Sequence, residues 1–339
     1  MTTAENKASR ITALDFTKGA LVLIMVFYHW INYFWGPQDN RYLRFLTPSF
    51  IFITGFIISH VYFSKYGLND PQLPKRLIQR GFKILAVFLV LNLGRSLVGT
   101  VPCLMSNNSS RSWLRELFSI YVLGSGIGGG QAKAVAFSIL IPISYLLLLS
   151  APLLILSRYL RYTFHVACLI FLLSTGLVSY LGFEVPNLQL LTIGLLGVIT
   201  GYLPIGKVNA LIEKPYFLIA AYIAYLCAIT LWDVIYPLQV IGVFLSLTII
   251  YMVGSSDGES SKARKIVILL GKYSLLGYIG QIAILQVLRL AFSRAASEVL
   301  VLALSFILAF ALTITAVAIV DLARVRLTPV DRIYKAVFS

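Results

Sequence analysis

Apolar runs of about 20 residues recur along the chain, and short polar or charged connections separate them. A helix of that length crosses the hydrocarbon core of a bilayer. We therefore predict an all-α, polytopic membrane protein with about ten transmembrane helices, near 12–34, 45–63, 81–99, 132–156, 163–182, 188–204, 215–232, 236–254, 266–288 and 298–320. No soluble segment or internal repeat interrupts this pattern, so a single integral-membrane domain over 1–339 is expected.

Composition and charge agree with a membrane protein. The chain is 59% hydrophobic and 12% charged, whereas soluble proteins are roughly a quarter charged. The net charge of +15 raises the question of nucleic acid, but Lys and Arg lie in short loops beside the apolar runs. With both termini in the cytoplasm, about twice as many of them fall inside as outside, as the positive-inside rule expects. The expected surroundings are membrane lipid and not nucleic acid.

Cysteine and histidine give no sign of a metal site. Cys103, Cys168 and Cys227 have neither disulfide nor metal-ligand spacing, and the last two lie in apolar runs, where they are expected to be buried. The three His residues are scattered, without a cluster of carboxylates near them. We therefore predict no metal.

The first expected helix carries ionisable residues within its apolar sequence. Such residues are costly in a bilayer and usually mark function. Steps of three and four residues place the following on one helix face: Asp15, Lys18, Val22, Met25, His29 and Asn32. Lys18 and His29 are eleven residues apart, so they point the same way at roughly 16 Å along the axis. We call this face the polar stripe.

Each stripe residue has a structural and a functional interpretation. A lone His on an apolar helix is often a satisfied structural residue, but a neutral imidazole can also accept a proton from a hydroxyl or amine. Lys18 can extend to the inner interface, or it can organise a site and bind an anion. Asp15 is placed to pair with Lys18 on the same face. We take His29, Lys18 and Asp15 as the candidate catalytic residues.

A second cationic group begins the third expected helix. Arg76, Arg80 and Lys83 can be inside charges that fix the topology. They can also form a phosphate site, because Arg80 and Lys83 are one helical turn apart. The chain has no Walker or dinucleotide-binding glycine pattern, so nucleoside triphosphates and NAD have no support.

Three further stretches add context. Thr54-Gly55 would let the second helix pack closely against the first. The segment from Gly271 to Gln281 has polar groups at helical spacing, which can be packing contacts. The long connection 100–131 can cap a site, re-enter the membrane or be a flexible connector.

In these motifs the chain resembles the integral-membrane acyltransferase type 3 family. The first helix reads Leu14-Asp15-Phe-Thr-Lys18-Gly19 through His29, like the family's "LDxxRGxxxxxVxxxH" with Lys in the cationic position. Phe52-Ile-Thr54-Gly55-Phe56 is similar to "FxxSGF", Arg80-Gly-Phe-Lys83 to an Arg-x-x-Arg motif, and 270–278 to "LGxxSxxxY". Gln281 departs from the family, since many members carry His there. Glucan succinyltransferases and heparan-glucosaminide-type N-acetyltransferases share parts of this pattern.

The resemblance implies transfer of an acyl group, often acetyl, from cytoplasmic acyl-CoA to a hydroxyl of a cell-envelope carbohydrate or lipid-linked glycan. It also implies a bacterial inner membrane. In this interpretation His29 is the general base, Lys18 orders the site, and Arg80 and Lys83, with Arg76, bind the phosphates of acetyl-CoA. The alternative is a proton-linked transporter or flippase for a glycan or lipid. Formation of a homo-oligomer is left open.

Overall fold

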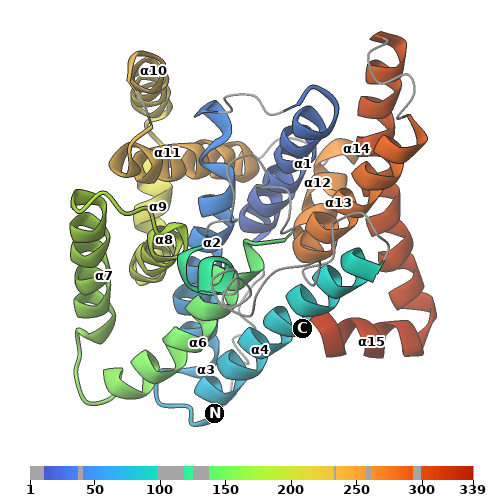
Figure 1. Cartoon of the computed structure of the whole chain (residues 1–339). Helices are drawn as coiled ribbons and strands as arrows, with labels where there is room; N and C mark the ends of the chain where they lie inside the picture. Colours follow the sequence, from blue (N-terminus) through green and yellow to red (C-terminus); the bar gives the residue numbers. More distant parts are fainter. Residues whose placement is uncertain are drawn as a thin grey trace, which may run out of the picture. The chain divides into compact units, whose positions relative to one another are not determined.

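The computed structural model describes residues 11–36, 41–97, 118–124, 137–232, 234–256, 261–292 and 299–338 (Figure 1). Within these ranges the chain is helical and has no strand. Its elements are α1 (Thr12–Phe34), η1 (Arg41–Leu43), α2 (Leu46–Ile57), η2 (Ile58–Phe63), α3 (Ser64–Tyr66), α4 (Gln72–Leu97), η3 (Ser119–Leu123), α6 (Leu140–Ser157), α7 (Thr163–Tyr180), α8 (Pro186–Gly201), α9 (Ile205–Ile212), α10 (Pro215–Leu231), α11 (Tyr236–Ser255), α12 (Lys262–Lys272), α13 (Ser274–Ala291), α14 (Val299–Arg326) and α15 (Thr328–Phe338). The predicted all-α fold is confirmed.

Seven helices of the described chain are long and apolar enough to cross a membrane: Thr12–Phe34, Arg41–Tyr66, Leu140–Ser157, Thr163–Tyr180, Tyr236–Ser255, Ser274–Ala291 and Val299–Arg326. An eighth is added if α8 and α9 count as one interrupted span. Counted by helix length and hydropathy, the described chain thus has fewer candidate spans than the ten expected from sequence. The helices α8 and α10 have only 16 and 17 residues, and α4 begins in a strongly basic segment. The side on which the termini lie stays a prediction.

The expected helix at 266–288 is two helices in the structure. The chain leaves helical geometry at Tyr273, which separates α12 from α13. Only α13 is a candidate span, because α12 has only 11 residues. Four of them are basic: Lys262, Arg264, Lys265 and Lys272. The prediction of one continuous helix is therefore wrong, and the polar segment that we expected to begin the span contains the break.

Contacts divide the chain into two compact units. Unit 1 consists of 1–50 and 205–338, and unit 2 consists of 51–204. Because the arrangement of the two units is not determined, each is described by itself. The expectation of one domain over 1–339 stays a prediction.

In unit 1, α1 packs against α11, α12, α13 and α14. Its closest approach is to α12, where backbone meets backbone. A Cβ atom added to Gly19 would overlap the carbonyl oxygen of Val267, and one added to Gly271 would overlap that of Asp15. Further along α1, a buried cluster joins it to α13 and α14, with members Val26, Trp30, Ile31, Leu285, Leu288 and Ala309. Trp30 also donates a hydrogen bond from Nε1 to Ser305 Oγ at 3.0 Å.

The last helix of unit 1 is tied to α14 by charge. Arg324 Nη2 lies 2.7 Å from Asp331 Oδ1, and Lys335 Nζ lies 2.6 Å from Asp331 Oδ2. Hydrogen bonds from Lys335 and then Arg324 hold the pKa of Asp331 below its usual value. The guanidinium of Arg324 also lies 3.9 Å from the centre of the Tyr334 ring. These contacts fix α15 at the end of α14.

In unit 2, α4 packs along α6, and α8 packs against η2, α6 and α7. The segment around Gly55 approaches α8 closely, because a Cβ atom on Gly55 would overlap the carbonyl oxygen of Gly194 and one on Gly197 would overlap that of Phe52. The small residues of the second helix therefore permit close packing, and within unit 2 their partner is α8. Packing of the second helix against the first stays a prediction.

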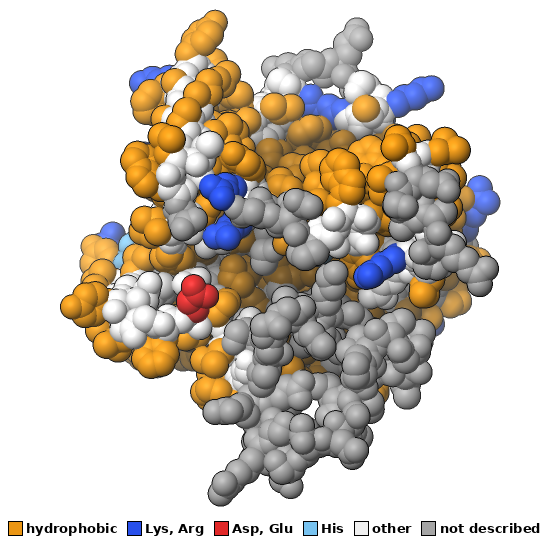
Figure 2. Space-filling model, turned by 45° about the horizontal axis from the view of Figure 1, so that its top comes forward, with side chains coloured by type: hydrophobic (Ala, Val, Ile, Leu, Met, Phe, Trp, Pro, Cys, Tyr) orange, Lys and Arg blue, Asp and Glu red, His pale blue; other side chains and the backbone are white. Residues whose placement is uncertain are grey.

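The described surface is rich in apolar side chains (Figure 2). On α10 the exposed ones include Tyr216, Phe217, Ile219 and Ile223, as expected of a helix that faces lipid. Cys168 is buried, as predicted, whereas Cys227 on α10 is exposed, so the prediction of its burial was wrong. An apolar residue of a membrane helix does not need the protein core, because lipid is an equally apolar surrounding.

We expect Gly19→Ala to destabilise unit 1 by about 1–3 kcal/mol or more, because the methyl group forces α1 and α12 apart. The matched control is Gly280→Ala on α13, where no atom lies within 4 Å of an added Cβ. That control should leave stability unchanged or raise it slightly, because Ala favours helix. Thermal unfolding of the purified protein in lipid nanodiscs measures both. Equal melting temperatures for the two variants would contradict the close packing of α1 and α12.

Candidate functional site

The polar stripe of α1 faces the interior of unit 1. Asp15, Val22 and Met25 are buried, and Lys18, His29 and Asn32 are partly buried. Lys18 Nζ lies 2.7 Å from Asp15 Oδ1, and the two side chains are 18% and 7% exposed. The predicted pairing of Asp15 with Lys18 is thus confirmed. The ammonium is held inside the unit by a carboxylate instead of extending freely to the interface.

His29 lies at the other end of the stripe, beside α13. Its ring centre is 5.2 Å from that of Tyr28 and 6.4 Å from that of Tyr278. The Nε2 atom is buried and has no hydrogen-bond partner among the described residues. Buried polar atoms are normally paired, so this nitrogen is not explained as a satisfied structural group. A neutral imidazole nitrogen can exchange a proton or a hydrogen bond with a molecule that reaches it.

Gln281 on α13 is the polar residue of this region that sequence reasoning did not assign. It is fully buried, at 0% exposure, and both Oε1 and Nε2 lack partners within the described part of the chain. Ser246 Oγ on α11, which packs against α1, is buried without a partner as well. The signal in the sequence was the polar spacing of Tyr278 and Gln281 within an apolar run, for which packing contacts were one interpretation.

The order of these groups along α1 follows from its contacts with α13. A Cβ atom on Gly277 would meet Val22, and Leu285 and Leu288 belong to the cluster of Val26, Trp30 and Ile31. The two helices therefore run in the same direction. Gln281 follows Gly277 by four residues, which places it about level with Val26 and roughly 4.5 Å short of His29 along the axis. It lies between the level of the Asp15–Lys18 pair and that of His29.

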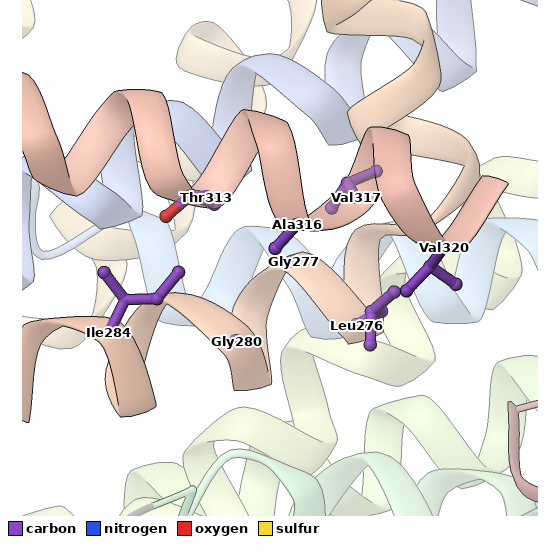
Figure 3. Close-up of a pocket in the computed structure, with 8 residues that line it drawn as sticks. All are labelled: Leu276, Gly277, Gly280, Ile284, Thr313, Ala316, Val317 and Val320. Atoms are coloured by element: carbon purple, nitrogen blue, oxygen red, sulfur yellow. The ribbon is translucent and has the colours of Figure 1, made fainter. Parts of the chain in front are cut away.

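A small cavity lies between α13 and α14 (Figure 3). Its volume is about 50 Å³, and it is lined by Leu276, Gly277, Gly280, Ile284, Thr313, Ala316, Val317 and Val320. Ligand sites usually have volumes of about 300–1,000 Å³. With Thr313 as the only hydroxyl in an otherwise apolar lining, this cavity is not a site for a sugar or a nucleotide.

In unit 2 the three predicted cations share one face of α4. Arg80 donates a hydrogen bond from Nη1 to Tyr62 Oη, and its guanidinium lies 5.7 Å from the centre of that ring. Arg76 lies 4.4 Å from the centre of the Tyr66 ring and donates from Nη2 to Gln72 Oε1 at 3.2 Å. Lys83 is one turn beyond Arg80 on the same face. We call Arg76, Arg80 and Lys83 the basic face.

The remaining histidines are accounted for by unit 2 itself. His60 Nδ1 lies 3.2 Å from the carbonyl oxygen of Gly201, and its ring stacks on Phe56. His165 stacks on Tyr202. Among the described residues, no group of three or more His, Cys, Asp and Glu comes together as a metal site. Most of the connection 100–131 lies outside the described residues, so its proposed role as a cap has no structural description.

The helices and the buried polar groups are compatible with a membrane protein that has a polar site inside unit 1. Comparisons of the chain with protein-family models, with curated proteins and with solved structures return no match. The resemblance to the acyltransferase type 3 family therefore depends on the motif residues alone.

We expect Asp15→Asn to destabilise the protein by about 3 kcal/mol, because it leaves the Lys18 ammonium without its carboxylate in a mostly buried place. Adding Lys18→Met to that variant should restore much of the loss. A double-mutant cycle on thermal stability in nanodiscs measures the coupling between the two. If the double variant loses as much as the sum of the two single variants, the ion pair does not contribute to stability.

Proposed function

We propose that the protein is a membrane acyltransferase that uses acyl-CoA, with acetyl-CoA the favoured donor, to acylate a hydroxyl of a cell-envelope carbohydrate or lipid-linked glycan. The proposal includes ten membrane-crossing segments, cytoplasmic termini and a bacterial inner membrane. It is supported by the motif resemblance, by the interior-facing polar stripe and by the basic face. The observation that carries it is the buried His29 Nε2 without a partner.

The proposed reaction is a direct exchange of bonds at the thioester carbon. The acceptor oxygen forms a bond to the acyl carbon, the carbon–sulfur bond breaks, and coenzyme A leaves as its thiolate. His29 Nε2 takes the proton of the acceptor hydroxyl and returns it to the departing sulfur. General base catalysis of this kind contributes about 10²–10⁴-fold to a rate.

The Asp15–Lys18 pair has an organising role in the proposal. Its ammonium is held by a carboxylate at 2.7 Å, so it adds little net charge to the site. An ammonium fixed in this way still presents the remaining N–H donors of its three. Because Lys18 lies roughly 16 Å along the axis from His29, these N–H groups would hold acyl-CoA at the inner end of the polar stripe and would not contact the reacting carbon. Asp15 thus positions Lys18 and does not itself exchange protons with substrate.

The basic face is assigned to the phosphates of coenzyme A. Arginine binds phosphate oxygens with parallel hydrogen bonds, and Lys adds a compact charge. The contacts of Arg76 and Arg80 with Tyr66 and Tyr62 restrict the two guanidinium groups before any ligand arrives. Preorganised cations lose less conformational entropy when they bind an anion.

His29→Ala should reduce acyl transfer by about 10²–10⁴-fold, because the proton acceptor is removed. Lys18→Ala should reduce it as well. His165→Ala is the matched control, because His165 is exposed and belongs to the other unit. Transfer is measured as radiolabel from [¹⁴C]acetyl-CoA that is incorporated into envelope glycans by purified protein in nanodiscs. Near wild-type rates in both His29→Ala and Lys18→Ala would show that these roles are wrong.

The double variant Arg80→Ala with Lys83→Ala should abolish the thermal stabilisation that acetyl-CoA gives the purified protein, because both proposed phosphate contacts are lost. Lys262→Ala with Arg332→Ala removes two exposed positive charges from the other unit and serves as the control. An unchanged stabilisation in the first variant would contradict the phosphate site. If wild-type protein is not stabilised by acetyl-CoA at all, the proton-linked carrier is favoured over the enzyme.

A further inference from the structure

The side-chain amide of Gln281 is the most unusual buried group in unit 1. It lies on a transmembrane helix with 0% exposure, and neither of its polar atoms has a partner among the described residues. A buried polar group without a hydrogen bond costs about 1–3 kcal/mol. Leu or Met would fill the same position on an apolar helix without that cost. The amide therefore needs an explanation other than stability.

Gln281 and His29 belong to the same contact between α13 and α1. Tyr278, one turn before Gln281 on α13, has its ring centre 6.4 Å from that of His29. Gln281 belongs to the buried residues of α13, together with Gly277, Tyr278 and Leu285, and Gly277 faces Val22 of the polar stripe. The amide of Gln281 and the imidazole nitrogen of His29, both without partners among the described residues, therefore occupy neighbouring positions along the contact between α13 and α1.

The chemistry of an amide restricts what can satisfy it. Gln281 offers two N–H donors and one carbonyl acceptor. A thioester carbonyl or a phosphate only accepts hydrogen bonds, so it would leave Oε1 unpaired. A hydroxyl group both donates and accepts, and a sugar presents several of them. The pantetheine arm of coenzyme A also carries amide and hydroxyl groups that can pair with both ends of the Gln281 amide, but the acceptor is the molecule that must bring a hydroxyl to His29.

We propose that Gln281 binds hydroxyl groups of the acceptor and holds the reacting hydroxyl near His29 Nε2. This proposal rests on the proposed acyltransferase function for the identity of the ligand as an acceptor. Gln281 is then a positioning residue that selects polyhydroxylated molecules, and it takes no part in proton transfer. Its neighbour Gly280 borders the small cavity toward α14, where an added Cβ would meet no atom within 4 Å (Figure 3).

The test compares two amphiphiles in nanodiscs: octyl glucoside, and the same molecule with every hydroxyl methylated, which cannot donate hydrogen bonds. We expect wild-type protein to bind octyl glucoside more tightly than its ether, as measured by thermal stabilisation at increasing ligand concentration. Gln281→Met should weaken octyl glucoside binding about tenfold or more and leave binding of the ether unchanged. Gln286→Met on the same helix is the control, because the amide of Gln286 already has a partner in Tyr33 Oη.

Stability separates this role from a structural one. Replacing an unpaired buried amide with an apolar side chain should leave the melting temperature equal or higher, and Gln281→Leu serves as a second variant. If both variants unfold or melt much lower, the amide has an internal structural partner and the proposal is overturned. The proposal is also overturned if wild type does not distinguish the two amphiphiles, or if Gln281→Met distinguishes them as well as wild type does.

The same measurements keep this proposal distinct from the acyltransferase assignment, because they need no acyl-CoA. Binding of octyl glucoside that depends on Gln281, together with an absence of acyl transfer, supports a hydroxyl-binding site and contradicts the enzyme. Acyl transfer that depends on His29 but not on Gln281 supports the enzyme and overturns the role of Gln281.

Discussion

The backbone contact between α1 and α12 is the constraint on which unit 1 depends. Gly19 and Gly271 let the two helices meet without side chains between them, and an added Cβ on either would overlap the other helix. Because Asp15 and Lys18 lie within one turn of Gly19, this contact also sets the position of the ion pair. The rest of α1 is then held against α13 and α14 by apolar packing. The polar stripe faces protein because its first turns are fixed in this way.

Unit 1 also contains buried polar atoms without hydrogen-bond partners among the described residues. His29 Nε2, Ser246 Oγ and the whole amide of Gln281 are buried without partners among the described residues. Each costs stability in an apolar surrounding, and all belong to α1 or to helices packed against it. Polar groups that a protein does not satisfy internally are best explained by a ligand that satisfies them.

The sequence predicted the features that depend on local pattern. Helical periodicity identified the polar stripe and its buried side, and spacing of three residues predicted the Asp15–Lys18 pair. The sequence did not predict the features that depend on tertiary packing. The break at Tyr273 interrupts an apolar pattern that looks continuous, and the glycines of α8 that pack against the segment of Gly55 lie about 140 residues further along the chain. The sequence also did not predict the burial of Gln281, because local sequence does not distinguish an amide that packs between helices from one that binds a ligand.

The most direct test of the account is mass spectrometry of envelope glycans from cells that lack the gene, supplied with either the wild-type chain or His29→Ala. The account predicts acylated glycans with the wild-type chain, and unacylated ones both with His29→Ala at equal protein level and with no chain at all. Identical glycans in all three would contradict it.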